Sequence, residues 1–153
     1  MDILEREGYV VRKPGQGTYA RLPENHHPKA LVVDDDPSVR RLFTRVLSDG
    51  GWDSVCVDSG EKALEQLEIQ SFDLIFLDLL MAGMNGAETL REIRKVDSET
   101  QVVIVTAYPE SEVMAQVLEV GPLTLIRKPF LIEELEAILT LVSRQSPVRA
   151  GGD

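Results

Sequence analysis

The sequence predicts an α/β protein built on a parallel sheet of five strands. Short runs rich in Val, Ile and Leu recur at 30–33, 54–57, 73–77, 101–105 and 123–126, with segments of helical apolar spacing between them. The runs are continuous rather than alternating, which is typical of strands buried on both faces. The pattern favours a flavodoxin-like, doubly wound sheet with strand order 2-1-3-4-5 and five helices on its two faces.

The expected helices carry terminal signals as well as apolar faces. Asp36 is a favourable N-cap and Pro37 a favourable first helical residue for the first helix, and Ser59 is a candidate N-cap for the second. The last helix is expected to end ahead of Pro147. In chain order, the apolar faces are marked by Val39, Leu42, Phe43, Val46 and Leu47; by Ala63, Leu64 and Leu67; by Ala87, Leu90 and Ile93; by Val113, Met114, Val117 and Leu118; and by Leu131, Leu135, Ile138, Leu139 and Val142.

The chain divides into three parts. Residues 29–144 form the α/β domain, and residues 1–28 form a leader. Within the leader, residues 9–12 and 18–21 are spaced to pair as a hairpin ahead of a Pro-rich linker. The tail at 145–153 is small and polar, and we expect it to be disordered.

The composition excludes several classes of protein. The 153 residues carry a net charge of −10, which argues against nonspecific binding to nucleic acid. Cys56 is the single cysteine, so an internal disulfide is impossible and a reducing cytoplasm suits the chain. No apolar run approaches the ~18 residues of a membrane span, and we expect no membrane insertion.

Polar residues suited to phosphoryl transfer follow four of the five expected strands. Asp34 and Asp35 follow the first strand, Asp78 the third, Thr106 the fourth and Lys128 the fifth. Carboxyl ends of parallel strands share one edge of a sheet, so we expect these side chains to converge there. Taken singly, each has a plainer interpretation, such as a helix cap, a strand-favouring Thr or a solvated Lys.

Together these residue types suit a metal-assisted phosphoryl site. Asp78 is the candidate nucleophile, because a carboxylate can attack a phosphoryl donor and form an acyl phosphate. Asp34 and Asp35 offer the oxygen ligands that Mg²⁺ prefers, and a cation offsets the repulsion between clustered carboxylates. Thr106 can hydrogen-bond a phosphoryl oxygen, and Lys128 can pair with its charge.

Four motifs in order carry a family resemblance: LVVDDDPSVR at 31–40, LIFLDLLMAGMNG at 74–86, VIVTA at 103–107 and KPF at 128–130. Over about residues 29–144 the chain resembles the receiver domain of two-component response regulators. The resemblance implies that Asp78 accepts a phosphoryl group from a histidine kinase or a histidine phosphotransfer protein.

The resemblance also implies the roles of the neighbouring residues. Asp35, Asp78 and the backbone carbonyl of Leu80 would ligate Mg²⁺, and Asp34 would act through water. Thr106 and Lys128 would hold the phosphoryl oxygens and draw the loop after the fourth strand inward.

A receiver domain of this kind is a switch rather than a turnover enzyme, although it assists its own phosphotransfer and dephosphorylation. Phosphorylation would shift the population toward a new surface on the fourth helix, the last strand and the last helix. The partners implied are a downstream effector protein and, in some cases, a second copy in a homodimer. The implied location is the cytoplasm.

Some positions depart from the family pattern. Ala82 stands where Pro is usual, and Leu125 stands where an aromatic side chain is common, so the usual aromatic switch would be absent or muted. Leu80 and Tyr108 flank the expected path of a hydrolytic water, and neither carries an amide or carboxylate to orient it. We therefore expect a comparatively long-lived phosphoryl group.

Three other classes of protein share part of this pattern. A phosphatase of the haloacid-dehalogenase type suits Asp34-x-Asp36-x-Ser38, but it leaves Asp78 without a role. A Rossmann domain carries glycines after its first strand, and this chain has none there. A receiver-like module that binds partners without phosphorylation is kept open by Ala82 and Leu125.

The leader carries a second, partial resemblance. Residues 4–19 resemble the end of the recognition helix and the wing of GntR-type winged-helix regulators. The preceding helices, which would dock in a groove, are missing from the sequence, so we do not expect DNA binding from this chain alone. A packing arm, a dimer contact, a disordered leader or the remainder of a longer chain are the alternatives.

Overall fold

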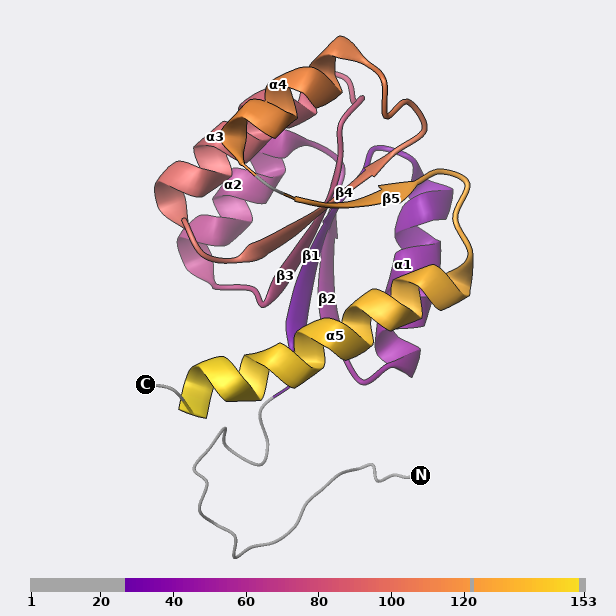
Figure 1. Cartoon of the computed structure of the whole chain (residues 1–153), viewed down its shortest axis with the longest axis vertical. Helices are drawn as coiled ribbons and strands as arrows, with labels where there is room; N and C mark the ends of the chain where they lie inside the picture. Colours follow the sequence, from indigo (N-terminus) through magenta and orange to yellow (C-terminus); the bar gives the residue numbers. More distant parts are fainter. Residues whose placement is uncertain (1–26, 122, 152–153) are drawn as a thin grey trace, which may run out of the picture.

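The computed structural model describes residues 27–121 and 123–151 as one parallel sheet with helices on both faces (Figure 1). The strands are β1 (Lys29–Val33), β2 (Asp53–Val57), β3 (Leu74–Asp78), β4 (Gln101–Thr106) and β5 (Thr124–Arg127). The helices are α1 (Pro37–Asp49), α2 (Gly60–Ile69), α3 (Gly86–Val96), α4 (Glu112–Val120) and α5 (Ile132–Gly151). The sheet order is β2-β1-β3-β4-β5, which confirms the predicted fold and strand order.

Alternate residues of each central strand face opposite sides of the sheet. On β1, Leu31 and Val33 belong to the core beneath α2, α3 and α4, whereas Ala30 and Val32 belong to the core beneath α1 and α5. All four side chains are almost completely buried. Figure 1 shows these two helical layers on either side of the sheet. A strand buried on both faces has no polar side, which explains the continuous apolar runs in the sequence.

The starts of four helices are capped by short polar side chains. Asp36 caps α1 and Ser59 caps α2, as the sequence predicts. Ser111 caps α4. Asn85 caps α3 in a capping box, in which the Glu88 carboxylate accepts a hydrogen bond from the Asn85 backbone N–H. The sequence prediction missed this box, although the Asn-x-x-Glu spacing was its signal.

The carboxyl end differs from the prediction. The last helix was expected to end ahead of Pro147, but α5 continues through Pro147 to Gly151, so that boundary was wrong. Pro147 lies inside this helix of 20 residues although proline has no backbone N–H to donate. The expected disorder of residues 145–153 stays a prediction.

Some predictions fall on residues that the structure does not describe. The hairpin and most of the linker expected in the leader lie at residues 1–26, outside the described residues. Residues 152–153 also lie outside them. Within residues 27–121 and 123–151, no helix has both the length and the apolar character needed to cross a membrane.

The loop between β3 and α3 is closed by a close approach of backbone at Gly86. The Gly86 N–H donates to the Leu79 carbonyl at 3.0 Å. A Cβ atom added at Gly86 would lie 2.5 Å from the Leu79 Cα and 3.1 Å from the Leu79 carbonyl oxygen. Because the atoms in the way belong to the backbone, no rotamer change would relieve the clash, so this position requires glycine.

We expect Gly86→Ala to destabilise the protein by about 1–3 kcal/mol, the usual cost of overpacking. Gly50→Ala is the matched control, because a Cβ at Gly50 would make only ordinary contacts of 3.5–3.6 Å at a negative φ. Urea unfolding followed by circular dichroism measures both variants. Equal stability of the two variants would contradict the steric argument.

Candidate functional site

The polar residues predicted from the strand ends meet at one edge of the sheet. Asp34 and Asp35 directly follow β1, Asp78 is the last residue of β3, Thr106 is the last residue of β4, and Lys128 directly follows β5. β1, β3 and β4 are consecutive neighbours in the sheet. Carboxylate oxygens of Asp34, Asp35 and Asp78 all lie within 4.8 Å of one another. The structure therefore brings together the three acids that were predicted from the sequence.

The acids differ in their access to water. Asp34 and Asp78 are 2% and 7% exposed, whereas Asp35 is exposed to solvent. The Asp78 Oδ1 accepts a hydrogen bond from the Leu80 N–H at 3.3 Å, and the Asp34 Oδ1 accepts one from the Asp36 N–H at 2.9 Å. Each buried carboxylate thus keeps one oxygen on the backbone and turns the other toward the centre of the site.

Lys128 occupies that centre. Its ammonium lies 2.9 Å from the Asp34 Oδ2 and 3.4 Å from the Asp78 Oδ2. The Lys128 backbone N–H donates to the Thr106 carbonyl at 2.8 Å, which ties the residue to the end of β4. The peptide bond from Lys128 to Pro129 is cis. Among the described residues, Lys128 is the only basic side chain in a salt bridge with these acids.

The Asp78 carboxyl group is harder to ionise than a free one. Burial, followed by the charge of Asp34, raises the pKa of Asp78 to about 6. The Lys128 ammonium and the Leu80 N–H oppose this rise without cancelling it. Burial by itself would lower the pKa of Lys128, but its hydrogen bond to Asp34 and the charge of Asp78 outweigh burial and raise it.

Thr106 is completely buried at the edge of the site. Its Oγ1 accepts the Tyr108 N–H at 3.0 Å. No hydrogen bond joins this hydroxyl to Asp78 or Lys128 in the part of the chain that the structure describes. As the hydroxyl serves here as an acceptor, its hydrogen is available for a further oxygen.

Arg40 is a supporting residue that the sequence prediction missed. One of its guanidinium nitrogens, Nη1, donates to the Asp34 carbonyl at 2.8 Å, and the Asp34 N–H donates to the Val57 carbonyl at 3.1 Å. These two bonds hold the backbone of Asp34 from α1 and β2. The only signal in the sequence was a basic residue one turn into the helix that follows the acids, and such a residue is usually solvated.

The donor set suits a divalent cation. Three carboxylates face one ammonium, and two of the carboxylates are buried. Mg²⁺ prefers oxygen ligands and is commonly held by one or two carboxylates together with phosphate and water. The exposed Asp35 leaves the cluster open to solvent on one side, so waters can complete the coordination. These features define an α/β domain with a cluster of three carboxylates that could hold a divalent cation.

The chain belongs to the response regulator receiver domain family, whose sequence profile matches residues 30–140. It is 38% identical over 109 residues to the transcriptional regulatory protein ZraR of Escherichia coli K12, covering 71% of this chain and 25% of ZraR. It is 35% identical over 107 residues to sporulation initiation phosphotransferase F of Bacillus subtilis 168, covering 70% of this chain and 86% of that protein. The chain therefore spans about a quarter of ZraR but most of phosphotransferase F.

Solved structures agree with this assignment. The chemotaxis protein CheY4 of Vibrio cholerae matches with a TM-score of 0.71 and 28% identity, over 76% of this chain and 99% of CheY4. TrrA of Thermotoga maritima, solved in complex with Mg²⁺-BeF, matches with a TM-score of 0.67 and 29% identity, over 75% of this chain and 98% of TrrA. The receiver domain of the sensor histidine kinase PA1611 of Pseudomonas aeruginosa holds a magnesium ion in its active site cleft and matches with a TM-score of 0.69 and 26% identity, over 74% of this chain and 95% of that domain. Receiver domains similar to this one thus bind Mg²⁺ in the active site.

Without a divalent cation, Asp78→Asn is expected to stabilise the protein. The folded pKa of about 6 lies above the usual ~3.9 of an Asp, so wild-type stability falls as pH rises from about 4 to about 6. Above about pH 7 in EDTA, the variant should be more stable than the wild type by about 1–3 kcal/mol. The gain should vanish below about pH 4, where both side chains are neutral. Urea unfolding across this pH range measures the difference.

Asp36→Asn is the control for this experiment. Asp36 caps α1 on the surface, and its hydrogen bonds with Ser38 lower its pKa, so its ionised form is favoured in the folded protein. Removing its charge should therefore give no gain in stability above about pH 7. An equal gain in both variants would show that lower net charge, rather than relief of the buried cluster, stabilises the protein.

Proposed function

We propose that this receiver domain accepts a phosphoryl group on Asp78 and thereby changes its affinity for a partner in two-component signalling. One observation carries the proposal. Asp78 is buried at the end of β3 with the carboxylates of Asp34 and Asp35 within 4.8 Å and the Lys128 ammonium at 3.4 Å. This arrangement supports both a nucleophile and a counter-charge for the group that it would receive.

The transfer is a displacement at phosphorus. An Asp78 carboxylate oxygen forms a bond to phosphorus, and the bond between phosphorus and the donor's nitrogen or oxygen breaks. The electron pair of the broken bond stays with the donor atom. The product is a mixed anhydride on Asp78. Mg²⁺ held by Asp35, Asp78 and the Leu80 carbonyl, with Asp34 acting through water, would neutralise charge on the phosphoryl oxygens.

Lys128 and Thr106 supply the remaining contacts in this proposal. Once Asp78 is phosphorylated, its carboxylate loses the charge that pairs with Lys128, and the ammonium is free to pair with a phosphoryl oxygen instead. Thr106 would donate its hydroxyl hydrogen to a second phosphoryl oxygen. Because the Tyr108 N–H is bonded to that same hydroxyl at 3.0 Å, a shift of Thr106 would pull on the loop after β4.

The change would be read on α4, β5 and α5. Leu118 on α4, Leu125 on β5 and Leu141 on α5 are 59%, 41% and 56% exposed. Exposed apolar side chains on these three elements suit a downstream effector protein or a second copy of the domain. We place the domain in the cytoplasm, where a histidine kinase or a histidine phosphotransfer protein would supply the phosphoryl group. The domain assists this transfer without turning over a substrate, and we do not propose that this chain binds DNA.

An alternative is a receiver-like module that binds partners without phosphorylation. Leu125 favours it, because the aromatic side chain common at this position is absent. The phosphatase alternative of the haloacid-dehalogenase type is less well supported. It needs Asp36 as a general acid, whereas the Asp36 carboxylate caps α1 and accepts hydrogen bonds from Ser38 at 2.7 and 2.9 Å.

Phosphorylation from a small-molecule donor tests the proposal directly. Incubation with acetyl phosphate and Mg²⁺ should add the mass of one phosphoryl group to the wild type and none to Asp78→Asn, as measured by intact mass spectrometry. Asp36→Asn should be labelled like the wild type, since Asp36 has no part in the proposed chemistry. A wild type that never gains this mass from any donor would favour the interaction module, and steady release of phosphate from a phosphomonoester would favour the phosphatase.

The lifetime of the phosphoryl group depends on the two residues that flank the path of water. Leu80 and Tyr108 are 42% and 59% exposed, and neither offers an amide or carboxylate to orient an attacking water. We expect slow loss of phosphate from the purified phosphoprotein, and severalfold faster loss from Leu80→Asn. Leu118→Asn, an equally polar change on α4, should leave the rate unchanged. Fast loss from the wild type that Leu80→Asn does not alter would contradict this prediction.

A further inference from the structure

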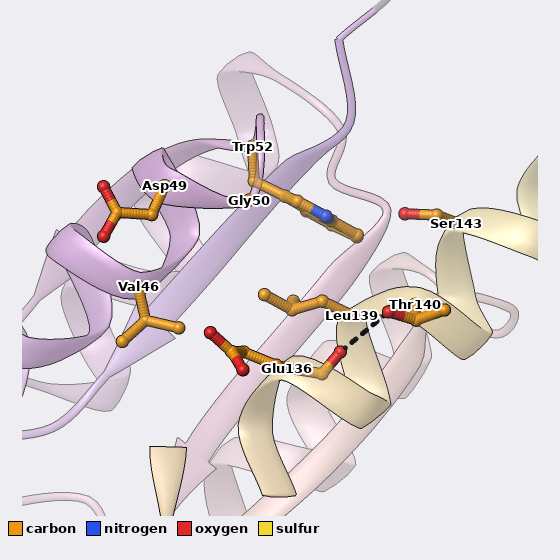
Figure 2. Close-up of a pocket in the computed structure, with 8 residues that line it drawn as sticks. All are labelled: Val46, Asp49, Gly50, Trp52, Glu136, Leu139, Thr140 and Ser143. Carbon is orange, nitrogen blue, oxygen red and sulfur yellow. Dashed lines mark hydrogen bonds between the residues drawn. The ribbon is translucent and has the colours of Figure 1, made fainter. Parts of the chain in front are cut away.

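A groove lies between the end of α1 and the middle of α5, and nothing in the proposed phosphotransfer uses it (Figure 2). Its volume is about 540 Å³. Val46, Trp52 and Leu139 form an apolar floor and are each only 4–5% exposed. Asp49 and Glu136 lie at the rim. Figure 2 shows the indole of Trp52 lying across the groove toward α5.

The groove is at the opposite end of the sheet from the phosphorylation site. Trp52 immediately precedes the first residue of β2, whereas Asp78 is the last residue of β3. Since the strands are parallel, their starts and their ends lie at opposite edges. An occupant of the groove would therefore leave Asp78 accessible to a phosphoryl donor.

The charges at the groove are unbalanced. Neither Asp49 nor Glu136 forms a salt bridge with any residue in the part of the chain that the structure describes. Two unpaired carboxylates beside buried apolar side chains complement an extended segment that has apolar residues followed by cations. This complementarity argues against an acidic occupant, including an acidic face of a second copy of a domain with this net charge.

The chain itself enters the domain beside this groove. The Asp53 N–H donates to the Pro28 carbonyl at 2.9 Å, and Asp53 is the neighbour of Trp52. The 26 residues that precede the described part of the chain thus connect to the domain within two residues of the groove floor. A tethered segment has a high effective concentration, so a modest contact is enough to keep it bound.

The leader contains a segment of the required chemistry. Residues 9–13 read Tyr-Val-Val-Arg-Lys, an apolar run followed by two cations. The 14 residues between Lys13 and Pro28 can span up to roughly 45 Å when extended, which is ample for a return to the groove. We propose that residues 9–13 bind in the groove between α1 and α5, with their apolar side chains on Trp52 and Leu139. Arg12 and Lys13 then pair with Asp49 and Glu136.

A spin label on the full-length chain tests this contact. Trp52 is the only tryptophan, so its indole N–H gives one assignable NMR signal. A nitroxide placed by Val11→Cys, in a Cys56→Ser background, should remove most of the intensity of the Trp52 indole signal and of the Leu139 amide signal. Amides of α4, on the other helical layer of the sheet, should keep theirs. Loss of intensity spread evenly over the domain would overturn the proposal.

Charge reversal separates a specific contact from chance proximity. Reversing the charges of either partner should restore the intensity of the Trp52 indole signal. The leader is reversed by Arg12→Glu with Lys13→Glu, and the groove by Asp49→Lys with Glu136→Lys. All four changes together should remove this intensity again, because the charges are then matched in the opposite sense. Glu112→Lys with Glu119→Lys on α4 is the matched control and should change nothing. Failure of the fourfold variant to restore the contact would refute the pairing.

A mixed sample distinguishes the leader of the same chain from a second copy. Spin-labelled chains without isotope are added to isotope-labelled chains without a nitroxide. The proposal expects no loss of signal in this mixture, and a loss would show that the groove binds another copy instead. The groove variants should still gain one phosphoryl group from acetyl phosphate, so failure of this proposal and failure of the proposal for Asp78 give different results.

Discussion

Burial of two carboxylates side by side is the constraint on which the proposed phosphorylation site depends. Asp34 and Asp78 have lost nearly all contact with water, and like charges at this separation repel strongly in a protein interior. Lys128 pairs with both, and backbone N–H groups hold their outer oxygens. The raised pKa of Asp78 shows that this compensation is incomplete. The resting site is therefore short of positive charge, which favours a bound cation and makes Lys128 ready to change partners.

The fold tolerates the unfavourable free energy of two buried acids because helices pack on both faces of the sheet. The two apolar cores on its opposite sides fix the strands, and the backbone beyond the strand ends is tied back to them. The Gly86 N–H closes the loop after Asp78 onto Leu79, and the Lys128 N–H is bonded to the Thr106 carbonyl. With the backbone fixed in this way, we expect the proposed change of charge at Asp78 to act first on side chains and on the loop after β4. That is the behaviour needed in a domain with two states.

α1 is the element that links the two ends of the molecule. Near its start, Arg40 holds the backbone of Asp34, and near its end, Val46 lines the groove beneath the start of β2. Between them, Phe43 packs on Phe76 of β3, with ring centroids 4.8 Å apart. The same helix therefore supports Asp34 at one end and lines the groove at the other.

The strands and the acids at their ends could be predicted from the sequence alone, because apolar periodicity and strand-end position are local properties of the chain. The strand order followed from the doubly wound architecture that this alternation favours. The sequence identified Asp34, Asp35 and Asp78 before any geometry was known. It did not show that Lys128 lies nearer to Asp34 than to Asp78, nor that Arg40 supports Asp34, because both contacts depend on how separate elements pack. It also ended α5 too early, since the cost of Pro147 could be read locally but the continuation of a long helix across it could not. Tertiary structure alone decided the charge balance of the site and the groove beside Trp52, because each is formed by residues that meet only after folding.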